Sequence, residues 1–129
     1  MGSRVPNGRH TLGRRAETLA ADYLQERGYA IVARNWRRPD GELDLVVTRD
    51  RDSLCVFVEV RSRTGIERGH PLETVNASKR SRVLRAARLY LDEEKPVATT
   101  FRFDVVGVTF ALDGGAPEIV HIEDAFQVS

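Results

Sequence analysis

Two apolar segments, GELDLVVT at residues 41–48 and LCVFVEVR at residues 54–61, decide the fold of this 129-residue chain. Both are rich in Val and Leu, and the polar residues 49–53 separate them, which predicts a β-hairpin. The second segment is apolar at successive positions, so both of its faces are buried, as is typical of a central strand. We therefore expect residues 42–48 and 54–61 to form the middle of a sheet.

The other elements follow on both sides of this hairpin. Leu and Ala recur at steps of three and four over residues 11–27, which predicts a helix that Thr11 caps and Gly28 ends. A second helix is predicted from Leu72 or Glu73 to Leu91. Runs of β-branched and aromatic residues predict further strands at 29–36, 101–110 and 118–122.

The order of these elements predicts an α/β domain with an αβββαβ core, in which helices flank a mixed sheet. The second helix would connect the third and fourth strands, so these two strands should run parallel. We expect residues 11–129 to form a single domain after a flexible segment at residues 1–10.

Composition narrows the class of protein. The single cysteine, Cys55, excludes an internal disulfide framework and a cysteine-based zinc finger. The chain has no apolar run of the roughly 20 residues that span a bilayer, and its first ten residues have no apolar signal region. We therefore expect a cytoplasmic protein that does not bind a membrane.

Charge is unevenly distributed, although the net charge is only +1. Residues 1–40 and 60–90 are basic overall, whereas residues 41–59 and 91–129 are acidic overall. Such segregation can create a basic surface for a polyanion. The alternative is a solvated surface of mixed charge.

The candidate functional residues are acidic residues inside the two central strands. Asp44 lies between two leucines and Glu59 between two valines. A buried carboxylate costs several kcal/mol unless it is paired, hydrogen-bonded or bound to a metal. If the strands pair, the two side chains can converge, and carboxylate oxygens are the ligands that Mg²⁺ prefers. The alternative is a structural ion pair, for example between Glu59 and Arg61.

Two helical residues extend this candidate site. Glu17 lies at the edge of the apolar arc of the first helix, from which it could reach over the sheet. Lys79 lies on the inward arc of the second helix, either as a rim residue whose charged end reaches solvent or as a ligand for a phosphate. By contrast, the strand residue Asp104 is explained most simply by a pair with Arg102 on the same face. The three histidines lack metal-ligand spacing.

The chain resembles the YraN-like family of small bacterial proteins over roughly residues 12–110. The resemblance rests on an ordered set of motifs: GRRAE at 13–17, RNW at 34–36, GELD at 41–44, VFVEV at 56–60, Val75 with Lys79, and RFD at 102–104. This family is classed with nucleases of the restriction-endonuclease-like (Holliday-junction-resolvase-like) fold. The resemblance implies that Asp44 and Glu59 bind the catalytic metal, with Glu17 matching the acid of the first helix.

One position departs from the nuclease signature. The signature has a lysine two residues after the acid of the third strand, where this chain has Arg61. Arginine stays protonated, so it cannot act as a general base, although it can stabilise negative charge. Lys79 would then substitute from the facing helix.

The resemblance implies an endonuclease that uses Mg²⁺ or Mn²⁺ and acts on the DNA backbone, with Arg61 and Lys79 holding the scissile phosphate. Phosphate contacts carry no base code, so cleavage would be structure-selective. A homodimer would suit a two-stranded substrate. The alternative is a nuclease fold without turnover that serves as a nucleic-acid-binding or adaptor module, which Arg61 favours. The residues expected to contact backbone phosphates are Arg37, Arg38, Arg63, Arg82, Arg85 and Arg88.

Overall fold

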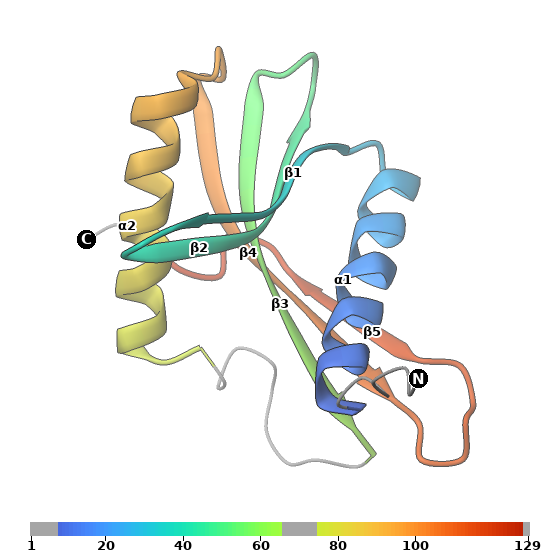
Figure 1. Ribbon diagram of the computed structural model, residues 1–129. Coiled ribbons are helices and arrows are strands. Elements are labelled where there is room, and N and C mark those ends of the chain that lie inside the picture. The colour runs from blue at the N-terminus through green and yellow to red at the C-terminus, as the bar shows by residue number, and fades with distance from the viewer. Residues whose placement is uncertain (1–7, 66–74, 128–129) are drawn as a thin grey trace, which may run out of the picture.

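The computed structural model describes residues 8–65 and 75–127, which form a five-stranded sheet with helices beside it (Figure 1). The predicted αβββαβ core is confirmed, and a fifth strand extends it. In chain order the elements are α1 (Gly8–Glu26), β1 (Ala30–Arg38), β2 (Gly41–Arg49), β3 (Leu54–Thr64), α2 (Ala77–Glu94), β4 (Thr100–Phe110) and β5 (Glu118–Ile122).

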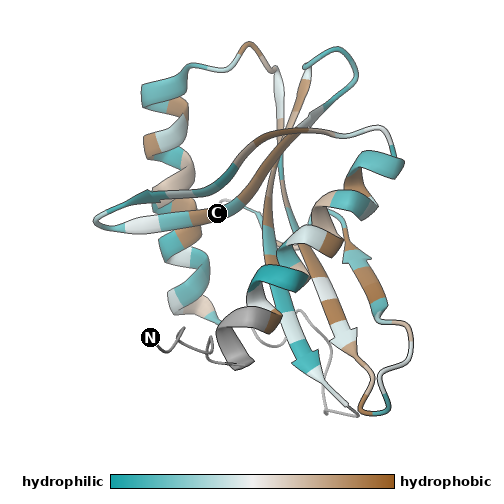
Figure 2. Cartoon of the chain, turned by 45° about the vertical axis from the view of Figure 1, so that its right-hand side comes forward, coloured by the Kyte–Doolittle hydropathy of each residue, from teal (hydrophilic) through white to brown (hydrophobic). Residues whose placement is uncertain are grey.

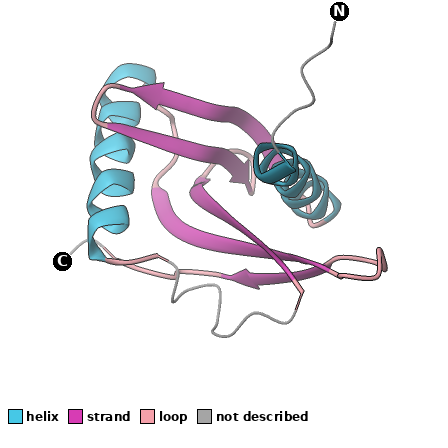
Figure 3. Cartoon of the chain, turned by 60° about the horizontal axis from the view of Figure 1, so that its bottom comes forward, coloured by secondary structure: helices cyan, strands magenta, loops and turns pink. Residues whose placement is uncertain are grey.

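The strands lie in the sheet in chain order, from β1 at one edge to β5 at the other. Neighbouring strands are antiparallel except for β3 and β4, which are parallel from Leu54 opposite Thr100 to Thr64 opposite Phe110. This confirms the predicted hairpin and the predicted parallel pair. Figure 3 shows α1 and α2 at opposite sides of the sheet.

Two apolar clusters form the core, one beneath each helix. Beneath α1, small residues such as Ala16 and Ala20 let the helix approach the valines and leucines of β2 and β3. Beneath α2, Val83 and Tyr90 pack against Phe57 and other residues of the central strands. Figure 2 accordingly shows apolar residues along the strands of the sheet. Each fully buried Val or Leu side chain contributes roughly 1.5–3 kcal/mol, so these clusters determine which faces the helices cover.

The first helix begins earlier than predicted. It starts at Gly8, so Thr11 lies inside the helix and is not its N-cap. Of the segment expected to be flexible, residues 1–7 lie outside the described residues and residues 8–10 belong to α1. The predicted end is confirmed, because Gly28 has a φ of 89° and its N–H donates back into the last turn. Neither helix of the described chain is long and apolar enough to cross a membrane.

The second helix begins later than predicted. Leu72 and Glu73 lie outside the described residues, and α2 starts at Ala77. Asn76 has extended backbone angles, and its side chain accepts a hydrogen bond of 3.0 Å from the backbone N–H of Lys79. Asparagine is among the best N-cap residues because it satisfies a helical N–H in this way. The helix therefore begins at this cap.

Close contact between β2 and α2 depends on Gly41. A Cβ atom at this position would lie 2.8 Å from the carbonyl oxygen of Arg82 and 2.9 Å from Cβ of Ala86. Only glycine fits there without moving the helix. The contact brings the start of β2 against the middle of α2 and so places the acidic residues of β2 near the basic residues of the helix.

Candidate active site

Asp44 lies where β2 and β3 separate. Their paired register ends at Leu45 opposite Val58, so Asp44 is the first β2 residue beyond the pairing (Figure 1). The backbone N–H of Val60 instead donates to Oδ2 of Asp44 over 2.8 Å. The Asp44 side chain thus replaces a missing backbone acceptor and bridges the two strands. This hydrogen bond fixes the carboxylate at the opening between them.

Glu59 follows directly after the last β3 residue that pairs with β2, and its side chain is only 9% exposed. Two cations flank it, because Nζ of Lys79 and a terminal guanidinium nitrogen of Arg61 each lie 3.8 Å from its Oε1. Lys79 reaches Glu59 from α2, whereas Arg61 is on the same strand. The structure therefore brings together four of the predicted residues: Asp44, Glu59, Arg61 and Lys79.

Burial raises the pKa values of both acids. Burial raises the pKa of Glu59 to about 8, and the charge of Asp44 adds to this while Lys79 opposes it. Burial also raises the pKa of Asp44; the hydrogen bond from Val60 opposes that shift and the charge of Glu17 adds to it. The protein thus holds two carboxyl groups together in a place where their charges are not fully balanced.

This arrangement predicts that the metal-free protein becomes less stable as pH rises. Unfolded glutamate ionises near 4.5, whereas folded Glu59 keeps its proton until about pH 8. Between these values the folded state binds more protons, so stability decreases with pH. One pKa unit corresponds to about 1.4 kcal/mol, and between pH 5 and 9 we expect a loss on the order of 4 kcal/mol. Urea denaturation in EDTA from pH 5 to 9 measures it.

Glu59→Gln serves as the comparison, because glutamine has a similar shape and does not ionise. The variant should lose much less stability across the same pH range. Parallel curves for the wild type and the variant would show that Glu59 is not the group responsible.

Glu17 lies beside this pair. Its Oε2 accepts a hydrogen bond of 2.9 Å from the side-chain amide of Asn35 in β1. Within residues 8–65 and 75–127, no three His, Cys, Asp or Glu side chains are grouped closely enough to form a ready metal cage. Asn35 was not among the predicted site residues, although it lies in the RNW motif and asparagine is unusual inside a strand.

The arginines that were predicted to contact phosphates differ in their exposure and in the residues they contact. Arg82, Arg85 and Arg88 are exposed along α2, and Arg63 is half-buried at the end of β3. Arg37 pairs with Glu42 over 3.2 Å. Arg38 is held by two structural contacts: its guanidinium binds Glu93 through hydrogen bonds of 2.7 to 3.1 Å and lies 4.0 Å from the ring centre of Trp36. We therefore leave Arg38 out of the candidate binding surface.

Asp104 forms a separate buried network. It is fully buried and accepts two hydrogen bonds from Arg102, at 2.8 and 2.9 Å, as the simple pairing interpretation predicted. It also contacts Nε2 of His121 at 2.7 Å and accepts a bond from the backbone N–H of Asp124. Arg102 in turn donates to the Tyr29 hydroxyl at 2.6 Å. Every oxygen of this carboxylate is engaged, so the network is structural.

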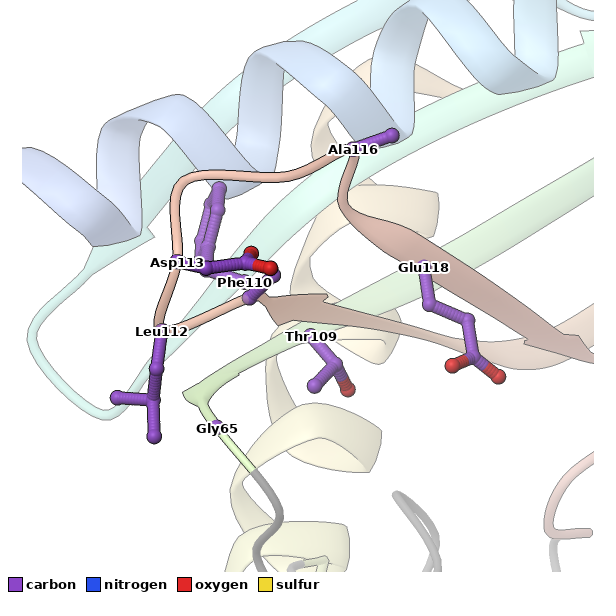
Figure 4. A pocket seen from close by; sticks show the side chains of 8 residues that line it. Gly65, Thr109, Phe110, Leu112, Asp113, Ala116 and Glu118 are labelled. Atoms are coloured by element: carbon purple, nitrogen blue, oxygen red, sulfur yellow. The ribbon is translucent and has the colours of Figure 1, made fainter.

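The larger pockets lie elsewhere. One of about 380 Å³ at the end of β4 has a mostly apolar lining that includes Phe110 and Leu112 (Figure 4). Another of about 420 Å³ lies at the opposite end of β4, beside Phe101. Neither includes Asp44 or Glu59. A smaller cavity of about 40 Å³ does include Glu59, together with Glu42, Lys79, Arg82 and Val83. It has room for about one water-sized species.

Comparison with known proteins identifies a family model and relatives that match most of this chain. A family model described as "Uncharacterised protein family UPF0102" matches residues 16–108, which include both acids, Arg61 and Lys79. A UPF0102 protein of Anaeromyxobacter dehalogenans is 48% identical over 93% of this chain and 87% of its own. Another, from Syntrophotalea carbinolica, is 43% identical over 93% of this chain and 94% of its own.

Proposed function

Because the chain belongs to the UPF0102 family, whose description states no activity, we propose from the site itself that it is a metal-dependent nuclease acting on the DNA backbone. The observation that carries this proposal is the pair of half-buried Asp44 and buried Glu59, with Lys79 and Arg61 flanking Glu59. The family membership agrees with the resemblance found in the sequence motifs. A relation to restriction-endonuclease-like nucleases is part of the proposal.

The residues present suit a hard divalent cation. Asp44 and Glu59 offer carboxylate oxygens whose pKa values are raised by burial, and a cation bound between them would stabilise their ionised forms. Mg²⁺ is commonly held by one or two carboxylates and retains several waters, so a complete protein cage is unnecessary. An ion bound there would supply Lewis-acid polarisation of a phosphate oxygen.

The basic residues would bind and orient the substrate. Lys79 and Arg61 would hold the scissile phosphate, because both place their charge within 3.8 Å of Glu59. They would also stabilise the negative charge that develops on the phosphate during hydrolysis. The residue Arg61 would not accept a proton from the attacking water.

A nuclease assay tests the proposal directly. Purified protein is incubated with supercoiled, linear and branched DNA in Mg²⁺, in Mn²⁺ and in EDTA at low salt. Cleavage that depends on the metal supports the proposal. Salt-dependent binding without products in either metal would overturn the hydrolytic activity and favour a nucleic-acid-binding module, which Arg61 in the lysine position makes the second candidate. Absence of both cleavage and binding would exclude DNA as the substrate.

The exposed arginines of α2 should contribute to DNA affinity without sequence preference. We expect the combined change of Arg82, Arg85 and Arg88 to Gln to reduce the slope of log affinity against log salt by roughly 2 to 3, because each lost phosphate contact releases one fewer counterion. Fluorescence anisotropy with a labelled duplex at several salt concentrations measures this slope.

A charge-matched control distinguishes the loss of phosphate contacts on α2 from the loss of net positive charge. Arg27 directly follows α1, and Arg49 and Arg51 lie at the end of β2 and in the β2–β3 turn, so none of the three belongs to α2. Changing these three to Gln removes the same charge and should leave the slope nearly unaltered. Equal effects of the two triple variants would contradict a binding surface on α2.

A further inference from the structure

Asn35 has a strained backbone in the middle of a strand. Its φ is 49°, in the left-handed region that residues other than glycine rarely adopt. In the described chain, the other non-glycine residues with positive φ lie in turns or after a helix: Asp50, Arg51, Asp52, Lys95 and Asp124. Strain of this kind tends to occur at functional sites. Asn35 therefore requires an explanation beyond the fold.

The register of the sheet places Asn35 next to the candidate site. Arg34 pairs with Leu45 and Trp36 pairs with Leu43, so Asn35 lies across from Asp44. Positions 35, 44 and 59 thus follow one another across β1, β2 and β3, because Asp44 and Glu59 both lie just beyond the Leu45–Val58 pair. The left-handed backbone occurs at the strand position that flanks the acidic pair.

The Asn35 side chain links this position to α1. Its amide nitrogen donates to Oε2 of Glu17 over 2.9 Å. Glu17 carries the same charge as Asp44 and is half-buried, and its long side chain has several rotatable bonds. Repulsion would therefore turn the Glu17 carboxylate away from the pair unless a donor held it. Asn35 supplies that donor.

We propose that Asn35 is a positioning residue that holds the Glu17 carboxylate beside the Asp44–Glu59 pair, where its charge strengthens the binding of a divalent cation. This inference rests on the proposed function. Groups that orient the carboxylates around a metal determine its affinity even though they do not touch it, and their loss typically lowers affinity 10- to 100-fold. Asparagine suits this role because it tolerates the left-handed backbone and carries an amide donor.

The test removes the amide while keeping the backbone. Glycine adopts a φ of 49° without strain, so Asn35→Gly should fold normally. Calorimetric titration of the full-length protein with Mn²⁺ should show an affinity about tenfold lower than that of the wild type. The control is Lys95→Gly, which removes an exposed side chain at a φ of 46° after α2 and should leave the affinity unchanged. Thermal unfolding in EDTA checks the fold of each variant.

A double-variant cycle shows whether Asn35 acts through Glu17. Glu17→Gln alone should lower the Mn²⁺ affinity by a similar factor, and adding Asn35→Gly to it should change the affinity less than twofold. Full additivity, or an unchanged affinity in Asn35→Gly while the wild type binds Mn²⁺, would overturn the inference and leave the proposed function standing. Absence of Mn²⁺ binding by the wild type would overturn both.

Discussion

Asp44→Asn is expected to abolish metal-dependent DNA cleavage while leaving the protein folded. The substitution removes one of the two carboxylates that would bind the ion, and we expect the rate to fall at least about a hundredfold. The asparagine oxygen can still accept the hydrogen bond that Val60 donates to this side chain. Because burial raises the pKa of Asp44, a neutral replacement should make the metal-free protein equally or more stable. Cleavage rates and urea denaturation in EDTA measure the two effects.

A loss of cleavage without a loss of stability distinguishes a catalytic role of Asp44 from misfolding. A variant that lost activity through misfolding would also lose stability. The control is Asp92→Asn, the same chemical change at an exposed position of α2, which should retain the wild-type rate. If Asp44→Asn cut DNA within about threefold of the wild-type rate, the Asp44–Glu59 pair would not be the catalytic site.

Asp104→Ala is expected to destabilise the fold strongly. The change leaves Arg102 and His121 without their carboxylate partner inside the protein. Removing one partner from a buried ion pair typically costs 3–5 kcal/mol, and we expect a loss of about that size. For a chain of this length, the loss corresponds to a melting temperature lower by roughly 10 to 20 °C. Urea and thermal denaturation at pH 7 provide both quantities.

A weaker contact of the same guanidinium provides the control. Glu123 lies 3.9 Å from Arg102, and its side chain is 58% exposed. Exposed pairs contribute little, so Glu123→Gln should cost less than about 0.5 kcal/mol. A loss in Asp104→Ala no larger than that in Glu123→Gln would show that the buried network does not stabilise the fold.

The effect of Asp104 should also depend on pH. Burial raises its pKa, but the hydrogen bonds from His121 and Arg102 outweigh this and hold the pKa below its ordinary value. The stabilisation is therefore present above the ordinary pKa and decreases as pH falls towards the folded pKa. The stability gap between the wild type and Asp104→Ala should narrow in strong acid.

Much of the fold could be predicted because its signals are local. The valine-rich segments of β2, β3 and β4 identify strands wherever they lie, and an intervening helix requires the last two to be parallel. The helix starts were wrong because a cap depends on the conformation of single residues. The helix α2 begins directly after Asn76, because the backbone of Asn76 is extended. Hydrophobic periodicity does not reveal such a change at a single residue.

The acids of the candidate site and the two cations beside Glu59, Arg61 and Lys79, could be predicted, but the hydrogen bond from Asn35 to Glu17 could not. Asp44 and Glu59 stand out because carboxylates are costly among apolar residues. Asn35 gave only a weak signal, since an Asn inside a strand is unusual but is also compatible with an ordinary surface position. The sequence likewise gave no sign that the guanidinium of Arg38 is engaged by Glu93 and Trp36, because both contacts depend on how α2 packs beside β1.

The sequence by itself determined the order of the elements, the apolar faces and the two acids within the central strands, because hydrophobic periodicity and the cost of burying charge act at each position separately. Only the tertiary structure decided that Asn35, Asp44 and Glu59 lie across neighbouring strands and that Lys79 reaches them from α2. Strand register and helix docking depend on packing over the whole sheet, including the close approach of α2 at Gly41. A local sequence pattern cannot predict them, because the contacts involve residues that are far apart in the chain.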